Sequence, residues 1–214
     1  LTITDRNKDI FAKETLEYIQ NLTLEIQDLA NVQSVTAITN IPLVSSSKKP
    51  LTELINNIPN IFSKDIDPEL AQQEIITSPI YKDLVISKDA KTTAMQVTLK
   101  ENTTLKEATI KKELYYKKYR QDDSYETQYL LSKEEYNNIS EAQKKSVSNL
   151  ITDIREVQEK YTSDRYEIRL GGIPMITDDM VTFIKNDLIN FGLGVLVFIL
   201  ATLIIIFRKL IWVI

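Results

Sequence analysis

The spacing of apolar residues in the first forty positions predicts a strand, a helix and a second strand. Residues 1–4 alternate between apolar and polar side chains, which is typical of a half-buried strand. Apolar residues then recur at spacings of three and four and define one face of an amphipathic helix, namely Leu16, Ile19, Leu22, Ile26 and Leu29. The second strand is predicted at residues 35–39.

The middle of the chain is less regular. Residues 40–80 contain five prolines and predict an ordered, irregular loop with short helices. Two apolar runs, at residues 84–87 and 93–99, flank a polar turn and predict a hairpin.

Residues 102–161 show a highly charged helical pattern. Two pairs have capping-box spacing, Ser132 with Glu135 and Ser140 with Gln143, and they predict helix starts. An apolar stripe follows at Val147, Leu150, Ile151, Ile154, Val157 and Tyr161. We interpret the segment at about 101–160 as a helical insertion.

A last strand is predicted at residues 166–170, where apolar residues alternate with charged ones. With the insertion set aside, the order is strand, helix, strand, strand, helix, strand. This order predicts an α+β domain with the ferredoxin-like, split βαβ arrangement.

Residues 188–207 carry no charged side chain. An α-helix of about 20 residues covers roughly 30 Å, the thickness of the hydrocarbon core of a bilayer, so this segment predicts a transmembrane helix. Arg208 and Lys209 follow, and residues 210–214 are apolar again. We expect residues 210–214 to begin a further transmembrane helix after a turn at the basic pair.

The charge distribution predicts the orientation. Arg208 and Lys209 are the only basic residues after Asp187, and no acidic residue follows it. Residues 1–187 therefore hold 24 of the 26 basic residues and all 30 acidic ones, a net charge of −6. Because positive charge beside a span stays in the cytoplasm, residues 1–187 are predicted to be extracytoplasmic. Their export requires an earlier membrane helix or signal sequence, which we expect upstream.

Two glycines and a proline lie where the last predicted strand meets the membrane helix. Gly171 and Gly172 accept a positive φ, and Pro174 suits the first position of a helix. Asp178 and Asp179 follow near the predicted helix N-terminus, where negative charge is favourable. We therefore divide the chain into a domain at 1–173 and a helix at 174–209 that continues into the span.

The sequence resembles the resistance–nodulation–division (RND) exporters, in the branch of the mycobacterial large membrane proteins (MMPL) and the hopanoid and sterol transporters. The matching stretches are residues 9–16 with the helix up to 32–36, residues 78–89, and residues 171–180. Two positions depart from the family. Ala90 stands where relatives often have glycine in the hairpin turn, and Ala12 where they often have a serine cap.

The resemblance implies a porter-type periplasmic loop between the first two membrane helices of a bacterial inner-membrane exporter. It implies proton-driven transport of hydrophobic or lipid-like substrates, with this part forming the substrate-passage domain and a coupling helix. The expected partners are the lipid bilayer, an amphipathic or lipid substrate, a second porter domain of the same parent chain, and further copies in a homo-oligomer. Residues 51–62 are a candidate apolar wall of the passage.

Composition excludes several kinds of chemistry. The chain has no histidine and no cysteine, which removes Ser-His-Asp and Cys-His catalysis and ordinary zinc or copper sites. Asp5, Asn7 and Asp9 have the spacing that opens an EF-hand loop, but Ile10 occupies the position that needs glycine. Adjacent carboxylates at 178 and 179 diverge by about 100° on a helix and do not converge on a substrate. We expect no catalytic residue, no cofactor and no metal.

Nucleic acid is not an expected partner, because the domain is acidic. The aromatic and basic run at 115–120 is interpreted as a solvated helix face. Two alternatives to the exporter remain open: the extracytoplasmic ligand-binding domain of a membrane sensor, and the porter-like domain of an ABC-type permease. A sensor predicts a signalling coiled coil after the span, whereas residues 210–214 predict a return into the membrane.

Overall fold

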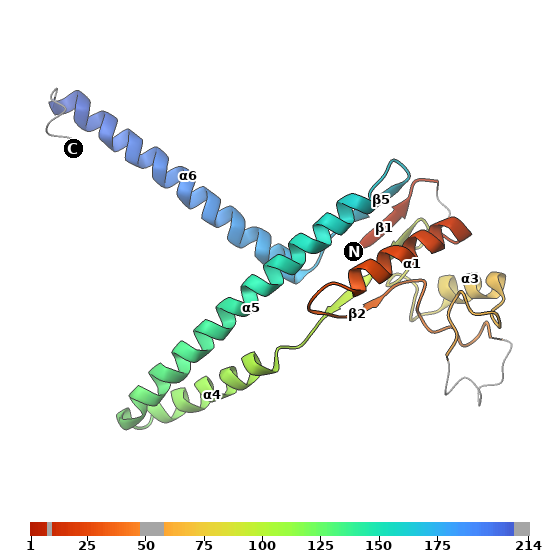
Figure 1. The fold of residues 1–214 in the computed structure, drawn as a ribbon, viewed down its shortest axis with the longest axis horizontal. Coiled ribbons are helices and arrows are strands. Elements are labelled where there is room, and N and C mark those ends of the chain that lie inside the picture. The colour runs from red at the N-terminus through yellow and green to blue at the C-terminus, as the bar shows by residue number, and fades with distance from the viewer. Residues whose placement is uncertain (8–9, 48–57, 208–214) are drawn as a thin grey trace. The chain divides into compact units, whose positions relative to one another are not determined.

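The structure, a computed structural model, describes residues 1–7, 10–47 and 58–207 of the 214. It is a mixed α+β protein with small antiparallel sheets and a long apolar helix at its C-terminal end (Figure 1). The chain divides into two compact units, Leu1–Gly171 and a second unit that begins at Gly172.

The elements follow the chain in this order. The first unit contains β1 (Thr2–Asp5), α1 (Lys13–Gln27), β2 (Val32–Thr36), α3 (Pro68–Thr77), β3 (Thr92–Ala94), β4 (Gln96–Leu99), α4 (Thr103–Tyr119), a 3₁₀ turn (Asp123–Tyr125), α5 (Glu126–Tyr161) and β5 (Tyr166–Arg169). The second unit contains α6 (Ile173–Phe207).

Strand β1 lies at the centre of a three-stranded antiparallel sheet, between β3 and β5. Strands β2 and β4 form a second, two-stranded antiparallel sheet. Met95 separates β3 from β4 and is almost fully buried. Its N–H donates to the Leu1 carbonyl, and its own carbonyl accepts from the Leu1 ammonium, both at 2.8 Å. The two sheets therefore adjoin at Met95.

Helix α1 packs beside the C-terminal part of α5, and both lie against the strands (Figure 1). The core that they cover is rich in isoleucine, and its largest fully buried aliphatic side chains are Ile3, Ile10, Ile19, Leu22, Ile26, Ile38, Ile41, Leu43 and Ile75. The predicted face of α1 is confirmed at Leu16, Ile19, Leu22 and Ile26. In α5, the predicted stripe is buried at Leu150, Ile151, Ile154 and Val157.

The second strand is displaced from its predicted place at 35–39. It begins at Val32 and ends at Thr36. Asn31 has a positive φ of 68° and turns the chain directly into the strand. At the other end, the Asn40 side chain accepts from the Ala37 N–H and donates to the Val35 carbonyl, at 2.8 and 2.7 Å. These local hydrogen bonds replace the ladder and end the strand early.

The predicted hairpin forms only in part, because its first arm at 84–87 is not a strand. The Tyr81 carbonyl accepts from the N–H groups of Leu84, Val85 and Ile86, which makes a tight turn there. The turn that follows still brings the Ser87 N–H to the Thr92 carbonyl at 2.9 Å. Ala90 takes a positive φ of 54° in that turn, a conformation that favours glycine.

The helical prediction for residues 102–161 is confirmed by α4 and α5. The two capping-box predictions are wrong, because Ser132 and Ser140 both lie inside α5. Ser132 instead donates from Oγ to the Tyr129 carbonyl, one turn earlier, at 2.8 Å. The cap that forms is Asn102, whose side chain accepts from the Leu105 N–H at 2.9 Å and begins α4.

Helix α6 is long and apolar enough to cross a membrane over Ile173–Leu203, by length and composition. It is 35 residues long and continues without a break to Phe207. Its large apolar side chains are exposed, for example Phe198 at 72% and Leu196 at 53%. The expected second span at 210–214 lies outside the described residues.

Candidate functional site

Helices α4 and α5 form an antiparallel hairpin with an unusually polar seam. The buried and half-buried positions recur at spacings of three and four on both helices: Leu105, Ala108, Lys112, Tyr115 and Tyr119 on α4, and Tyr129, Ser132, Tyr136, Ile139 and Gln143 on α5. This is the heptad spacing of a coiled coil. Tyrosine, lysine, serine and glutamine occupy most positions where a coiled coil normally has leucine or isoleucine, so the seam leaves an open groove.

Specific pairs fix the register of the hairpin. Asn102 donates to the Gln143 side chain at 2.7 Å near the base. Further along, Lys111 forms an ion pair with Glu135 at 2.6 Å. Near the tip, the tyrosine rings of the two helices meet. The two helices are therefore held in one alignment despite their shortage of aliphatic contacts.

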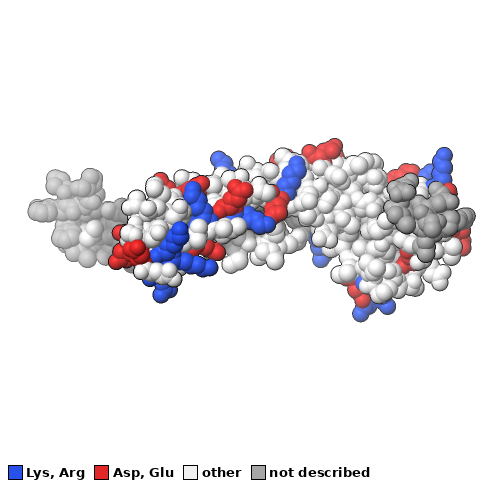
Figure 2. All heavy atoms as spheres, turned by 90° about the horizontal axis from the view of Figure 1, so that it is seen from below, with Lys and Arg blue, Asp and Glu red and all other residues white. Residues whose placement is uncertain are grey.

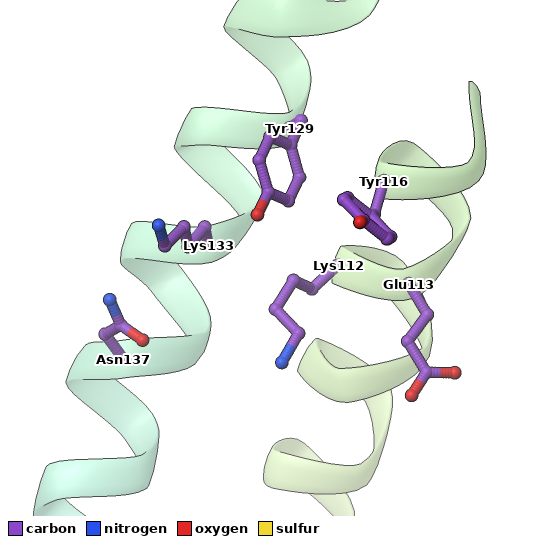
Figure 3. A pocket seen from close by; sticks show the side chains of 6 residues that line it. All are labelled: Lys112, Glu113, Tyr116, Tyr129, Lys133 and Asn137. Carbon is purple, nitrogen blue, oxygen red and sulfur yellow. The ribbon is translucent and has the colours of Figure 1, made fainter. Parts of the chain in front are cut away.

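The groove between the two helices has a volume of about 330 Å³. It is lined by Lys112, Glu113 and Tyr116 from α4 and by Tyr129, Lys133 and Asn137 from α5 (Figure 3). Figure 3 shows the side chain of Lys112 extending between the helices, whereas the carboxylate of Glu113 points away from it. Its volume is at the lower end of the range for ligand pockets, which begins at roughly 300 Å³.

The aromatic wall of the groove is ordered by ring contacts. The Tyr129 ring stacks on Tyr119 with centroids 5.5 Å apart and planes 6° apart. Tyr116 lies 5.4 Å from Tyr129 at an angle of 45°, and 44% of Tyr116 is exposed. Stacking on Tyr119 therefore holds the Tyr129 ring in place, whereas Tyr116 is partly exposed to solvent.

Two ammonium groups at the groove have no carboxylate partner among the described residues. Lys112 Nζ lies 3.5 Å from the Tyr136 ring centroid, and Lys133 Nζ lies 6.0 Å from the Tyr129 centroid. The neighbouring Glu135 is already paired with Lys111. A cation over a ring face keeps N–H groups available for an added acceptor.

Outside the groove, the charges of the hairpin are mixed. Figure 2 shows Lys and Arg side chains interleaved with Asp and Glu over α4 and α5 on the face drawn. A nucleic-acid surface needs a continuous basic patch to follow the phosphates. The groove is therefore a local cationic site on a surface of mixed charge.

A second hollow of about 400 Å³ lies at the base of the hairpin. It presents Lys145 and Asp153 together, so its charges balance. The Asn31 side chain there already donates to Ser146 Oγ at 2.9 Å. This hollow is the weaker candidate.

The domain also contains a buried ion-pair network that the sequence pattern did not reveal. Asp5 is fully buried and accepts from Asn7 N–H at 2.8 Å and from Thr15 Oγ1 at 2.9 Å. Arg165 Nη2 lies 3.2 Å from Asp5 Oδ2, and its Nη1 lies 2.7 Å from Glu14. Burial raises the pKa of Asp5, but hydrogen bonds from Arg165, Asn7 and Thr15 outweigh burial and lower it. The network joins β1, α1 and the start of β5.

A tyrosine cluster continues from this network along α1. Tyr18 stacks on Tyr166 with ring centroids 3.9 Å apart and donates to the Tyr161 carbonyl. Tyr161 Oη lies 2.8 Å from Glu25, and burial followed by this hydrogen bond raises the pKa of Tyr161 to about 12. The Tyr161 hydroxyl therefore remains protonated at neutral pH, which is consistent with a structural role.

Of the predicted junction residues, Gly171 ends the first unit, and Gly172, Pro174, Asp178 and Asp179 lie at the start of the second. Gly172 has a φ of +136°, which side-chain-bearing residues rarely adopt, and its carbonyl accepts from the Ile176 N–H at 3.1 Å. Pro174 is the second residue of α6. Asp178 and Asp179 lie in the second turn of α6, beyond the first turn where the helix dipole acts most strongly.

The other candidate segments provide weaker evidence for a functional site. Residues 51–57 of the expected apolar wall lie outside the described residues, while Ile58 and Phe62 at its end are about half exposed. Of the rejected calcium loop, Asp9 lies outside the described residues, and Asp5 is taken by Arg165 and Thr15. Within the described part of the chain, no group of three or more acidic residues is arranged to hold a metal ion.

Comparisons with protein-family models, with curated proteins and with solved structures find no match to this chain. The interpretation of residues 115–120 as a solvated helix face does not predict the groove, because Tyr116 lines it. The heptad spacing of Leu105, Ala108, Lys112 and Tyr115 is the pattern that would have placed Lys112 inside the hairpin.

Proposed function

We propose that this chain is a part of a proton-driven RND-type exporter of hydrophobic or lipid-like molecules in the bacterial inner membrane. In this proposal the first unit forms the periplasmic passage domain and α6 couples it to the membrane. The observation that carries the proposal is α6, a 35-residue helix that begins four residues after β5 ends at Arg169 and runs into 20 uncharged residues, 188–207. A helix that served only as a membrane anchor would instead be joined to its domain by a linker.

The strand pairing supports a porter-type domain. Strand β1 pairs with β5 and β3, and β4, directly after β3, pairs with β2. All of these pairs are antiparallel, and the connection from β1 to β2 contains α1. With β3 and β4 taken as one strand interrupted at Met95, this order supports the proposed split βαβ, ferredoxin-like arrangement.

The side chains of the span support a coupling role rather than proton transfer. Residues 188–207 contain no ionisable group. Proton relays in transporters use acidic or histidine side chains inside the membrane. In an exporter, these groups would belong to other membrane helices, and α6 would transmit movement between them and the domain.

Efflux measurements in cells that express the complete protein test this proposal. We expect an energised cell to extrude an amphipathic dye such as N-phenylnaphthylamine faster than a cell without the protein, and a protonophore to abolish the difference. A panel of amphipathic dyes that is extruded at the same rate with and without the protein would contradict the exporter.

The orientation has a separate test, because the chain has no native cysteine. Ser124 is exposed at the tip of the hairpin, and Ser124→Cys provides a single labelling site. A membrane-impermeant maleimide should label this variant in intact spheroplasts. Labelling that requires lysis would place the domain in the cytoplasm.

A second candidate is the extracytoplasmic ligand-binding domain of a membrane sensor, which the groove between α4 and α5 favours. A sensor would bind a ligand in the groove and would show no efflux. The two tests above separate these functions, since both place the domain outside the cytoplasm but only the exporter moves the dye.

A further inference from the structure

The face of α4 opposite to α5 contains two exposed apolar side chains. Ile110 is 60% exposed and Leu114 is 50% exposed. Lys112 faces α5, and because successive helix residues turn by about 100°, the positions two residues before and after it lie on the far side of α4. Ile110 and Leu114 are also one turn apart, so their side chains are neighbours. Exposed apolar side chains are common on protein surfaces, and the charges around this pair distinguish it.

A glutamate and a lysine flank the apolar pair at equal distances. Glu107 lies three residues before Ile110, and Lys117 lies three residues after Leu114. Both charged side chains are exposed, and within the described part of the chain neither forms an ion pair. The dipole of α4 favours a basic residue in its last turn, but it does not account for the apolar pair between the charges. We call these four residues the outer stripe of α4.

The outer stripe is complementary to itself. Its spacings of three, four and three residues are those of the core positions of a coiled coil. Because the four positions are symmetric about residue 112, an antiparallel second copy brings Ile110 opposite Leu114 and Glu107 opposite Lys117. Each of these contacts then occurs twice, as two-fold symmetry requires. A parallel copy in register would instead place like charges opposite each other at both ends.

The lysines beside the outer stripe do not oppose this pairing. Lys106 forms an ion pair with Glu101 at 3.0 Å, and Lys111 forms one with Glu135 at 2.6 Å. Both lysines therefore have a carboxylate partner within their own copy. The unpaired charges of the stripe, at positions 107 and 117, remain available to a second copy.

The small size of the stripe limits the strength of the contact. A stable protein interface buries roughly 1,000 Å² or more, which a single stripe with two apolar side chains per copy does not provide. Copies held in one bilayer meet at a high effective concentration, which allows a weak contact to form. Helix α6 is long and apolar enough to hold each copy in a membrane. The contact therefore suits membrane-bound copies rather than chains diluted in micelles.

We propose that the outer stripe of α4 binds the same stripe of a second copy of this chain, in an antiparallel and two-fold symmetric pair of helices. Ile110 packs against Leu114 of the other copy at the centre, and Glu107 pairs with Lys117 at each end. This contact goes beyond the proposed export function, because it concerns how copies associate and applies equally to an exporter and to a sensor.

Disulfide cross-linking in membranes tests the register, because the chain has no native cysteine. Full chains with Glu107→Cys or Lys117→Cys carry different affinity tags and are expressed separately or together. We expect oxidation to link the two variants to each other but neither variant to itself. In the antiparallel pair, the two copies of position 107 lie about 15 Å apart along the helices, and a disulfide requires Cα atoms within about 7 Å. Equal cross-linking of one variant alone would overturn the antiparallel register, and no cross-link in the mixture would overturn the contact.

Charge reversal tests the contact by energy transfer in phosphatidylcholine liposomes. Full chains carry donor or acceptor dyes at Ser124→Cys. Lys117→Glu should lower the association constant at least about tenfold, because it replaces two attractive pairs of the symmetric dimer by two repulsive ones. Adding Glu107→Lys to the same chain should restore association. Lys144→Glu, an exposed lysine of α5, is the matched control and should have no effect. A double reversal that stays as weak as Lys117→Glu would overturn the pairing of positions 107 and 117.

The apolar centre has its own control on α5. Ile110→Ser combined with Leu114→Ser should abolish the energy transfer, whereas Leu130→Ser, at a residue that is 52% exposed, should not change it. Circular dichroism of each variant verifies that the hairpin is folded. Energy transfer that is equal in all folded variants would overturn the proposal. Its absence from the wild-type chain at every protein density would leave this face to another protein or to lipid, and would also overturn it.

Discussion

Asp5 offers the sharpest test of what holds the first unit together. Its carboxylate is fully buried where β1 meets α1 and the start of β5, and it accepts hydrogen bonds from Asn7, Thr15 and Arg165. The change Asp5→Ala removes the only buried charge in this network and leaves three donors without their acceptor. We expect a large loss of stability from this single substitution.

The magnitude follows from the geometry of the pair. Removing one member of a buried ion pair costs roughly 3–5 kcal/mol, because the other charge is left uncompensated. The Arg165 side chain is 31% exposed and keeps its contact with Glu14 at 2.7 Å, so part of its charge remains satisfied. The lower end of the range, about 3 kcal/mol, is therefore the expected loss for Asp5→Ala. Glu14→Gln removes an exposed partner of the same arginine and should cost less than about 1 kcal/mol.

Urea unfolding in detergent micelles, followed by far-ultraviolet circular dichroism, measures both free energies. The pH dependence gives a second readout through Asp5→Asn, which keeps the shape of the side chain but not its charge. Because the pKa of Asp5 is lowered from 3.8 in the folded state, its charge stabilises the fold above that pH and ceases to do so as the pH falls. The difference between wild type and Asp5→Asn should therefore shrink below about pH 4. A loss for Asp5→Ala no larger than that for Glu14→Gln, or a difference that is independent of pH, would refute the reasoning.

Three further predictions concern local geometry. Glu74→Ala should lower the free energy of unfolding by about 2 kcal/mol in the same urea assay, because Glu74 accepts three backbone N–H groups and a serine hydroxyl from the loop at 44–46. Ala90→Gly should raise the free energy of unfolding by about 0.5–1 kcal/mol, because Ala90 has a positive φ of 54°; a destabilised variant would contradict the turn. Gly172→Ala should cost about 1–3 kcal/mol in thermal unfolding, since its φ is +136°, whereas Gly171→Ala has open space around an added Cβ and should be neutral. Equal effects of the two glycine substitutions would contradict the backbone conformation at Gly172.

Elements with strong periodicity could be predicted from the sequence, and their burial explains why. The face of α1 and the stripe in the C-terminal part of α5 both pack on the core, so the spacing of their apolar residues follows the period of the helix. The beginning of β2 could not be predicted in this way. Its limits depend on the αL conformation of Asn31 and on hydrogen bonds of the Asn40 side chain, which compete with the ladder and leave no trace in hydropathy.

The candidate site was hidden for a different reason. Lysine and tyrosine usually occupy exposed faces, so a charged helix with scattered tyrosines predicts a solvated surface. Here Lys112 takes a seam position, where its aliphatic stem packs and its ammonium lies on the Tyr136 ring. Such a placement depends on the partner helix, whose matching tyrosine lies 24 residues further along the chain. The heptad spacing within α4 places Lys112 on the packed face, but a pattern confined to one helix does not show which side chain it meets there.

Helices α5 and α6 have nearly equal lengths, 36 and 35 residues, but their side chains require different surroundings. Along most of its length α5 combines a narrow packed stripe with charged residues that need water. In α6 the segment 188–207 carries no charged side chain, and its large apolar side chains from Leu188 to Leu200 are exposed, so no choice of packed face could shield them all from water. Burial of apolar surface contributes about 25 cal/mol per Å², and a helix without a polar face gains this only when an apolar medium surrounds it. The lipid bilayer is such a medium, and this physical requirement supports a membrane location for α6 independently of any resemblance to a transporter family.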